Sequence, residues 1–207
     1  MTPPTPTVFV VDDDQAITES LRWLIESDGL KVETFSNGQS LLNALDNNRI
    51  GCIVLDIRMP GLSGIELQEK LKAQKKHFPV IFITGHGDVP MAVRAMKMGA
   101  ADFLTKPFRD HILLETIHKA IADNQKERNQ QELLNEINKT IAMLTPREFE
   151  VMQYVVAGKL SKAIAIDLGI GNKTVEIHRA RIMKKMRAHS LADLVKKVFL
   201  HEMIRRN

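Results

Sequence analysis

The sequence predicts two domains of different class: an α/β domain on a doubly wound, five-stranded parallel sheet, followed by an all-α domain of four helices. In residues 1–123, short apolar runs bounded by turn residues alternate with helical patterns, which is typical of β-α units. From residue 144 onward the apolar spacing is helical only. Charge divides the chain in a similar place, because residues 1–139 carry a net charge of −3 and residues 140–207 a net charge of +7. The basic second part is suited to bind a polyanion.

The first two β-α units occupy the N-terminal part of the chain. Residues 8–11 form the apolar run VFVV, which leads directly into Asp12, Asp13 and Asp14. Three adjacent carboxylates repel one another, so a fold that gathers them at one crevice usually holds a cation there. Apolar residues then repeat at helical spacing up to Gly29, which predicts a helix at residues 15–28. A short strand at residues 31–35 and a helix at residues 38–45 follow.

The third predicted strand organises the domain. Residues 53–55 are apolar and lead into Asp56, and Pro60, Gly61 and Gly64 break the chain just after it. Such a run predicts a strand buried on both faces of a parallel sheet. Asp56 then lies at the carboxyl end of the strand, where open α/β sheets place their ligand chemistry. A lone aspartate at a strand end can equally cap a turn, so the other strand ends decide between the two interpretations.

The last two strands also end in polar residues. The strand at residues 80–83 ends at Thr84, and the strand that begins at Phe103 leads into Lys106. Helices are predicted between and after these strands, at residues 65–75, 91–98 and 110–123. Five β-α units predict a flavodoxin-like sheet of order 2-1-3-4-5 with right-handed crossovers. Its switch point lies between the first and third strands, where the strand-end aspartates would converge.

Together, the strand ends supply the groups that phosphoryl transfer requires. Oxygen ligands without a nearby His or Cys favour Mg²⁺ over zinc. The hydroxyl of Thr84 can donate a hydrogen bond to an oxyanion, and Lys106 brings a positive charge. Mg²⁺ and Lys106 would offset the charge of a phosphate placed on Asp56. The sequence therefore predicts a phosphoryl-transfer site.

Residues 7 to about 123 resemble a response-regulator receiver domain, and the segment ITGHGDVP at residues 83–90 resembles the FixJ branch of that family. The resemblance implies that Asp56 is the phospho-acceptor and that Asp12, Asp13, Asp56 and the backbone carbonyl of Arg58 hold Mg²⁺. It also implies that Thr84 and Phe103 form a switch pair and that Lys106 binds the phosphate. In this family the peptide bond at the position of Lys106 and Pro107 is cis.

Residues 124–140 are strongly polar and contain neither Gly nor Pro. Their few apolar side chains, Leu133, Leu134 and Ile137, make too short a stripe to indicate a coiled coil. We interpret this stretch as a helical linker that continues the last receiver helix. The predicted domains are therefore residues 1–123, the receiver, and residues 141–207, a DNA-binding domain, with residues 124–140 as the spacer between them.

Four helices are predicted after the linker. Thr145, Pro146 and Glu148 form a capping box with Pro at the first helical position, and the helix they start stops at Gly158. Ser161 is expected to cap a second helix at residues 162–168, and Gly169 begins a tight turn. A third helix at residues 172–187 and a fourth at residues 190–204 complete the set. Two short helices joined by a Gly-containing turn, with a basic second helix, indicate a helix-turn-helix.

The third of these helices is the candidate for DNA recognition. Val175, Ile182 and Met186 are spaced to share one buried face, completed by His178 or Arg179 and Met183. On the other side, cations can bind phosphates, while Glu176 and Ile177 suit contact with base edges. An ordinary solvated amphipathic helix is the alternative. The residues predicted to contact DNA are Lys162, Lys173, Thr174, Glu176, Ile177, His178, Arg181 and Lys184.

Residues 144–204 resemble the LuxR/NarL type of helix-turn-helix domain, on the segments LTPRE at residues 144–148, KAIA at residues 162–165 and KTVEIH at residues 173–178. Two residues depart from that pattern. Ser161 replaces a frequent asparagine, and Gly171 takes the place of a polar residue that commonly caps the recognition helix. Gly costs only a few tenths of a kcal/mol against the better caps, so the helix should form. The fourth helix, with Leu191, Leu194, Val195 and Val198 on one stripe, could join two copies or pack only within its own domain.

These patterns predict a protein that regulates transcription, as an activator, rather than an enzyme. It would receive a phosphoryl group on Asp56 from a sensor histidine kinase, form a homodimer when phosphorylated, bind double-stranded DNA and act on RNA polymerase. An enzyme of the haloacid-dehalogenase type, a Mg²⁺-dependent phosphatase, is the alternative. That class places a second aspartate two positions after the nucleophile, where this chain has Arg58.

Composition predicts a cytoplasmic protein that does not meet the membrane. The chain has a single cysteine, Cys52, beside a predicted core strand, which fits a reducing compartment. The N-terminus, MTPPTP, lacks the basic and apolar regions of a signal peptide. No apolar run approaches the roughly 18 residues of a membrane span.

Overall fold

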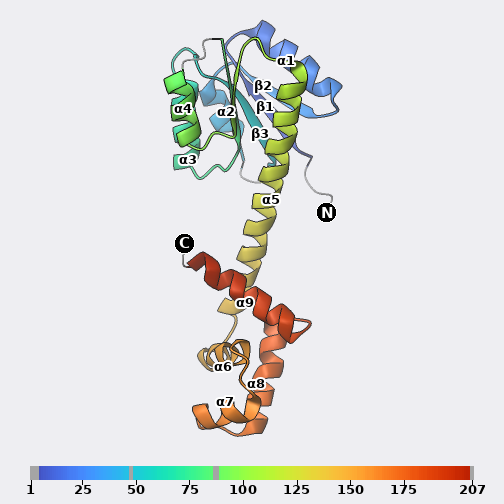
Figure 1. The fold of residues 1–207 in the computed structure, drawn as a ribbon, viewed down its shortest axis with the longest axis vertical. Helices are drawn as coiled ribbons and strands as arrows, with labels where there is room; N and C mark the ends of the chain where they lie inside the picture. Colours follow the sequence, from blue (N-terminus) through green and yellow to red (C-terminus); the bar gives the residue numbers. More distant parts are fainter. Residues whose placement is uncertain (1–4, 47–48, 86–88, 206–207) are drawn as a thin grey trace. The chain divides into compact units, whose positions relative to one another are not determined.

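The computed structural model describes residues 5–46, 49–85 and 89–205 (Figure 1). Residues 86–88 of the FixJ-like segment and residues 1–4 of the N-terminus lie outside this part of the chain. The chain forms two compact units, residues 1–128 and 129–207. One helix, α5 (Asp110–Ala142), contributes residues to both. It is continuous through residues 124–140. The boundary between the receiver and the linker at residue 123 stays a prediction.

Unit 1 contains the predicted parallel sheet. Its strands are β1 (Thr7–Val11), β2 (Lys31–Phe35), β3 (Gly51–Asp56), β4 (Val80–Thr84) and β5 (Asp102–Thr105). They are paired in parallel in the order β2-β1-β3-β4-β5, which confirms the predicted topology. The helices of this unit besides α5 are α1 (Gln15–Ser27), α2 (Gly38–Ala44), α3 (Gly64–Ala73) and α4 (Val89–Lys97).

The sheet is covered on both faces, because alternate side chains of β1, β3 and β4 enter two separate cores. Phe9, Leu55 and Phe82 pack with residues of α2 and α3 on one face. Val10 and Val54 pack with residues of α1 and α5 on the other face. Figure 1 shows α3 and α4 on one side of the sheet and α5 on the opposite side. Burial on both faces explains why these strands are continuous apolar runs.

The strand register determines where the polar residues lie. Val11 of β1 is paired with Leu55 of β3, so the residues that follow this pair in the chain, Asp12 and Asp56, lie side by side. Thr84 of β4 is paired with Thr105 of β5, and Lys106 follows. One carboxyl edge of the sheet therefore gathers the groups that the sequence places at four strand ends.

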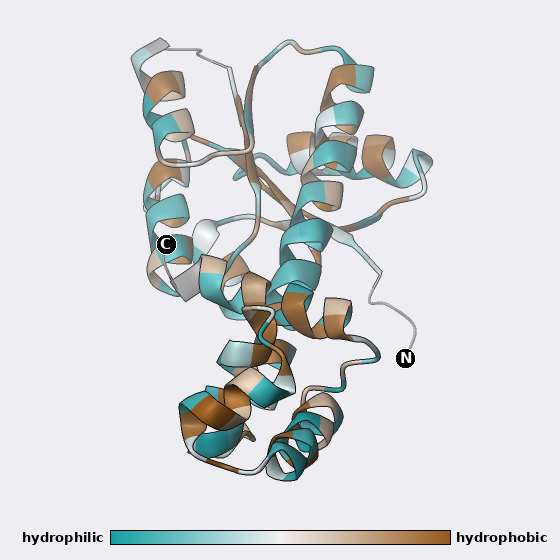
Figure 2. Cartoon of the chain, turned by 60° about the horizontal axis from the view of Figure 1, so that its bottom comes forward, coloured by the Kyte–Doolittle hydropathy of each residue, from teal (hydrophilic) through white to brown (hydrophobic). Residues whose placement is uncertain are grey.

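Unit 2 is all-α apart from its turns, as predicted. After the last part of α5 it contains α6 (Pro146–Val156), α7 (Ser161–Leu168), α8 (Asn172–Lys185) and α9 (Leu191–Arg205). Its core gathers one stripe from each helix, including Val151, Ile164, Val175, Ile182 and Leu194. Figure 2 shows apolar and polar residues alternating along the helices, which is the amphipathic pattern of helices that pack on one face.

Two predictions about helix ends are corrected. Ser161 is the first residue of α7 rather than its cap, because the N–H of Ile164 bonds to the carbonyl of Leu160 and starts the helix one residue earlier. Leu160 is therefore the cap residue, and no side-chain hydrogen bond caps this helix. Helix α8 ends at Lys185 instead of residue 187, because Arg187 takes a left-handed conformation with φ of 49°.

Replacing Leu160 with Ser is expected to stabilise unit 2 by about 1 kcal/mol, because a Ser hydroxyl at this position can accept a hydrogen bond from a free N–H of the first turn. The present leucine is 77% exposed, so little packing is lost. Urea unfolding of the intact chain, followed by a probe in unit 2, measures the change. Ser161→Ala is the matched control and should change the stability by less than about 0.5 kcal/mol. A larger loss of stability in the Ser161→Ala control would show that Ser161, and not residue 160, is the capping residue.

The apolar residues of α9, the fourth helix predicted for the DNA-binding domain, fall into a buried set and an exposed set. Leu194 and Val198 are buried in the core of unit 2, whereas Leu191, Phe199 and Met203 are exposed. Leu194 and Val198 therefore pack within their own domain, which leaves Leu191 from the predicted stripe at the surface.

Among the described residues, no helix is both long and apolar enough to cross a lipid bilayer. Cys52 is a buried core residue, as predicted.

Candidate functional site

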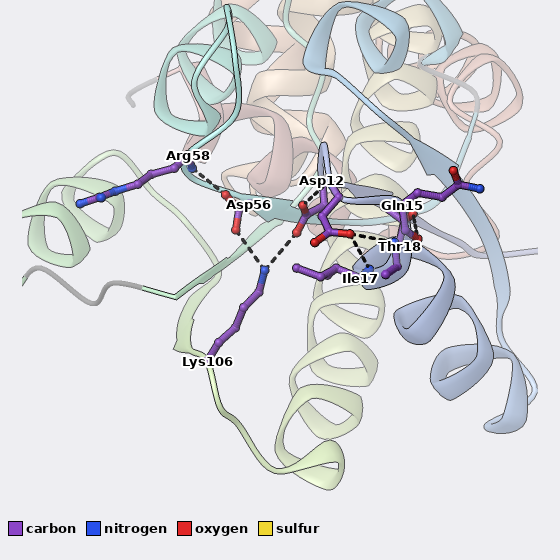
Figure 3. A network of polar contacts seen from close by, with 9 residues as sticks. Asp12, Gln15, Ile17, Thr18, Asp56, Arg58 and Lys106 are labelled. Atoms are coloured by element: carbon purple, nitrogen blue, oxygen red, sulfur yellow. Dashed lines mark hydrogen bonds and ion pairs between the residues drawn. The ribbon is translucent and has the colours of Figure 1, made fainter.

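The candidate site is centred on Asp56, at the carboxyl end of β3 (Figure 3). Asp56 is only 7% exposed. Its Oδ2 accepts a hydrogen bond of 2.7 Å from the backbone N–H of Arg58. Its Oδ1 lies 3.2 Å from Nζ of Lys106, and the same Nζ lies 3.0 Å from Oδ2 of Asp12. One ammonium group thus bridges two buried carboxylates that are far apart in sequence.

The three adjacent aspartates have three different surroundings. Asp12 is buried, and its Oδ1 also accepts the N–H of Asp14 at 3.0 Å. Asp14 caps α1 by accepting the N–H groups of Ala16 and Ile17. Asp13 is exposed to solvent. Only one of the three is therefore held in the ion-paired centre, one stabilises a helix end, and one faces outward.

Electrostatics distinguish the two partners at the centre. Burial raises the pKa of Asp56, and this effect outweighs the hydrogen bonds from Arg58 and Lys106, which lower it. Burial alone would lower the pKa of Lys106, but its contacts with Asp12 and Asp56 raise it overall. Lys106 is therefore a stable cation at neutral pH. The charged form of Asp56 is poorly solvated, so it gains more from a cation or a phosphoryl group than an exposed carboxylate would.

The predicted switch residues lie on the neighbouring strands. Thr84 ends β4 and is almost fully buried, and its carbonyl accepts the N–H of Lys106 at 2.8 Å. Phe103, in β5, is partly buried and packs against the core formed with α2 and α3. The peptide bond between Lys106 and Pro107 is cis. The sheet therefore brings both residues to the strands next to Asp56, while their switch role stays a prediction.

The oxygen atoms around Asp56 are of the kind that Mg²⁺ prefers, namely carboxylates and backbone carbonyls. Within the described ranges, however, no three Asp, Glu, His or Cys side chains gather into a metal-binding cluster. Asp12 and Asp56 converge on Lys106, and the exposed Asp13 is not part of that group. The donor chemistry of Asp12 and Asp56 thus fits the ion, and the full ligand set stays a prediction.

Sequence reasoning named Gly64 only as a residue that breaks the chain after β3, but its small size is what the site requires. A Cβ atom built on Gly64 would come within 2.5 Å of the backbone oxygen of Asp56. Its N–H also donates to the carbonyl of Ile57 at 3.0 Å. The start of α3 can therefore lie directly against the acceptor residue only because this position has no side chain.

The second candidate site is the exposed face of α8 in unit 2. Val175, Ile182 and Met186 are fully buried, which confirms the predicted inner face. Most residues predicted to contact DNA are exposed: Lys162, Lys173, Thr174, Glu176, Ile177, Arg181 and Lys184. His178 differs, because it is half-buried and its Nδ1 is enclosed without a hydrogen-bond partner among the described residues.

Two contacts that sequence reasoning missed hold the helix-turn-helix to α6. Nζ of Lys185, at the end of α8, lies 2.6 Å from the carboxylate of the buried Glu148. The guanidinium of Arg147 donates to the carbonyl of Leu168, at the end of α7, at 2.7 Å. The bond from Lys185, followed by that from the backbone of Thr145, lowers the pKa of Glu148 to about 2. The capping box identified Glu148, but nothing local indicated its distant partner.

Comparison with known proteins covers both units. Residues 8–118 match the family described as response regulator receiver domain, and residues 142–198 match bacterial regulatory proteins, luxR family. The transcriptional regulatory protein FixJ of Bradyrhizobium diazoefficiens is 45% identical over 91% of this chain and 92% of its own. FixJ of Azorhizobium caulinodans is 46% identical over 93% of this chain and 92% of its own.

Solved structures give the same result. The solved structure of the response regulator StyR is 47% identical in sequence, and the match covers 94% of this chain and 98% of that chain with a TM-score of 0.87. The structure of full-length FixJ from B. japonicum is 42% identical, and the match covers 97% of this chain and 98% of that chain with a TM-score of 0.59. Both similarities extend over at least 94% of the chain, and so over both units.

Proposed function

Because this chain belongs to the two-component response regulators that join a receiver domain to a LuxR-family DNA-binding domain, we propose that phosphorylation of Asp56 controls its binding to DNA. The observation that carries this proposal is the bridge from Lys106 to both Asp12 and Asp56 at the carboxyl edge of the sheet. A sensor histidine kinase is the phosphoryl donor, and the regulated output is activation of transcription through RNA polymerase.

The residues of unit 1 divide the work of phosphoryl transfer. A carboxylate oxygen of Asp56 attacks the phosphorus, and the donor leaves with the electrons of the broken bond. Lys106, already beside Asp56, binds a phosphoryl oxygen, and the hydroxyl of Thr84 donates to another. Asp12, Asp13, Asp56 and the carbonyl of Arg58 would hold Mg²⁺. When bound, the ion offsets negative charge on the phosphoryl group.

The phosphoryl group then acts as a switch. It adds negative charge and three acceptor oxygens, which Thr84 and Lys106 reach by moving inward. Movement of Thr84 opens space for Phe103, which is only partly buried before the change. The surface of α4, where Val93 and Met96 are exposed, changes with it and becomes the contact of a homodimer.

Dimerisation provides the affinity for DNA that one copy lacks. A single helix-turn-helix buries little surface, so two copies should bind half-sites about one helical turn, or ~34 Å, apart. In unit 2, the exposed Leu191, Phe199 and Met203 of α9 supply an apolar stripe for this pairing. The net charge of +7 on residues 140–207 favours the DNA backbone.

The test combines chemistry, assembly and binding on the intact chain. Protein treated with acetyl phosphate and Mg²⁺ should carry one phosphate on Asp56, sediment as a dimer, and bind a DNA site selected from a random pool more tightly than untreated protein. Phosphorylated protein that stays monomeric at high concentration would contradict the dimerisation step. Multiple turnover on small phosphate esters, in place of a stable acyl phosphate, would support the phosphatase alternative.

Substitutions on α8 should separate phosphate contacts from base contacts. Lys173→Ala or Arg181→Ala is expected to weaken binding to all sequences several-fold and to reduce the salt slope by about 1, as a lost phosphate contact does. Glu176→Ala or Ile177→Ala should instead change which sequence is preferred, by about 1–3 kcal/mol at the affected base pair. Binding of each variant to matched and scrambled sites at two salt concentrations measures both effects. Equal salt slopes in all four variants would contradict this division.

A further inference from the structure

The turn between α8 and α9 contains a residue in an uncommon backbone conformation. Arg187 follows Met186, the C-cap residue of α8, and has a φ of 49°. Such left-handed backbone suits Gly, because a Cβ atom comes close to the following carbonyl oxygen. The turn closes as many helix ends do, since the N–H of Ala188 donates to the carbonyl of Met183 at 2.9 Å. A residue with a side chain keeps this conformation only where surrounding contacts hold it.

Lys197 of α9 supplies such a contact. Its Nζ lies 3.2 Å from the carbonyl oxygen of Met186 and 2.7 Å from that of Arg187. These carbonyls lie at the end of α8, where the helix no longer provides an N–H partner. The ammonium group therefore binds the backbone on both sides of the turn, and its positive charge also suits the negative end of the α8 dipole.

Asp193, one turn earlier in α9, holds Lys197 in this position. Its Oδ2 lies 3.2 Å from Nζ of Lys197 and accepts the N–H of His189 at 3.0 Å. The side chains of Lys197 and Asp193 are only 21% and 29% exposed, so this ion pair is more sheltered than most at the surface. An ammonium group has three N–H donors, and here all three have an oxygen partner. One side chain thus joins the end of α8 to α9.

The two helices joined by Lys197 have different tasks in the proposed function. Helix α8 presents the exposed residues predicted to contact DNA. Helix α9 presents the exposed apolar stripe proposed for pairing two copies, namely Leu191, Phe199 and Met203. When two copies pair through α9, the angle between α9 and α8 determines how far apart the two recognition helices lie and in which directions they point.

We infer that Lys197 is a positioning residue that sets the half-site separation this regulator accepts in its DNA target. The inference rests on the proposed pairing of two copies on two half-sites. Each base pair added between the half-sites moves the second one by about 3.4 Å and turns it by about a tenth of a helical turn. A rigid joint between α8 and α9 should therefore accept one separation, whereas a loose joint should accept several.

DNA sites of altered half-site separation test the inference. The intact chain is phosphorylated with acetyl phosphate and Mg²⁺, and its dissociation constant is measured on a site selected from a random pool. The same measurement is made on versions with one or two base pairs added or removed at the centre. Wild type should lose affinity about tenfold or more with each change, because the DNA must be twisted to fit. Lys197→Met should bind the selected site about tenfold more weakly and lose no more than about twofold with each change.

Two matched variants separate position from charge. Lys197→Arg keeps a cation with several N–H donors at this place and should restore most of the wild-type dependence on separation. Lys196→Met removes the same charge from the next residue of α9, which is exposed, and should leave that dependence unchanged. A flattened dependence in Lys196→Met equal to that in Lys197→Met would assign the effect to charge alone and overturn the positioning role.

A further pair of variants separates position from stability. Arg187→Gly relieves the left-handed residue, so adding it to Lys197→Met should stabilise the turn without restoring the contact with α9. The double variant should be folded by circular dichroism and still accept several separations, whereas Arg187→Gly alone should keep the wild-type dependence. A double variant that regains the wild-type dependence would show that Lys197 acts only on the stability of the turn.

The remaining outcomes distinguish this inference from the proposed function. A loss of affinity in Lys197→Met that is equal at every separation, or an unchanged dependence, would overturn the positioning role while binding to two half-sites stands. Wild-type protein that binds all separations alike would overturn the proposed binding to two half-sites, and this inference with it.

Discussion

Asp56→Asn is expected to abolish phosphate uptake from acetyl phosphate and from a kinase alike. The amide is nearly isosteric with the carboxylate, but it is a far weaker nucleophile and cannot form a stable acyl phosphate. When phosphate uptake is lost, phosphate-dependent dimerisation and the gain in DNA affinity should also disappear. Intact-protein mass spectrometry after treatment with acetyl phosphate and Mg²⁺ measures the uptake directly. Full phosphorylation of the variant would refute the assignment of Asp56 as the acceptor.

The same variant should fold at least as well as the wild type. Burial raises the pKa of Asp56 above its ordinary value, so the charged form at neutral pH costs stability that a neutral amide avoids. Lys106 keeps its contact with Asp12 in the variant. Thermal unfolding should show a midpoint for unit 1 at or above that of the wild type. Asp123→Asn, an equivalent change on an exposed position of α5, is the control for both measurements.

Glu148→Gln is expected to destabilise unit 2 by about 2 kcal/mol, because a hydrogen bond between charged groups contributes roughly 1.5–3 kcal/mol. The amide keeps the shape of Glu148 and can still accept from Thr145, but the charge that binds Lys185 is gone. Since this pair joins the start of α6 to the end of α8, the position of the recognition helix should loosen and DNA affinity should fall. Urea unfolding near pH 7 measures the loss. Glu150→Gln, which removes the half-exposed partner of Arg147, should cost less than about 1 kcal/mol.

The effect of Glu148 should also depend on pH. Its pKa falls from an ordinary value of 4.5 to about 2 in the folded protein, so the folded state favours the charged form. The stabilisation is therefore complete above about pH 4.5 and declines as the pH falls toward 2. The difference in stability between wild type and Glu148→Gln should shrink over this window. A difference that stays constant from pH 7 down to pH 3 would show that the charge of Glu148 is not what stabilises unit 2.

The sequence by itself determined the order of the helices and strands, the topology of the sheet and the residues at its carboxyl edge. These features are local. A buried parallel strand requires an apolar run, a packed helix requires an apolar stripe, and both are visible within a few residues. Because parallel strands end at one edge, Asp12, Asp56, Thr84 and Lys106 could be placed together from the strand ends alone.

Only the tertiary structure decided which of these residues touch and which distant groups support them. Asp12, Asp13 and Asp14 are equivalent in the sequence, yet one binds Lys106, one is exposed and one caps α1. The contact of Glu148 with Lys185 joins residues 37 positions apart. A cleft lined by Arg58, from the loop after β3, and by Arg94, from α4, likewise forms where separate elements meet.

Even a short-range feature such as the cap of α7 followed the packing. Leu160 occupies the position that a hydrogen-bonding residue would favour, and Ser161, the better capping residue, lies inside the helix. The start of α7 is fixed by the burial of Ile164 and Ala165 in the core of unit 2. A cap contributes about 1 kcal/mol, whereas burying one aliphatic side chain contributes about 1.5–3 kcal/mol. Where local preference and core packing disagree, packing therefore decides the structure.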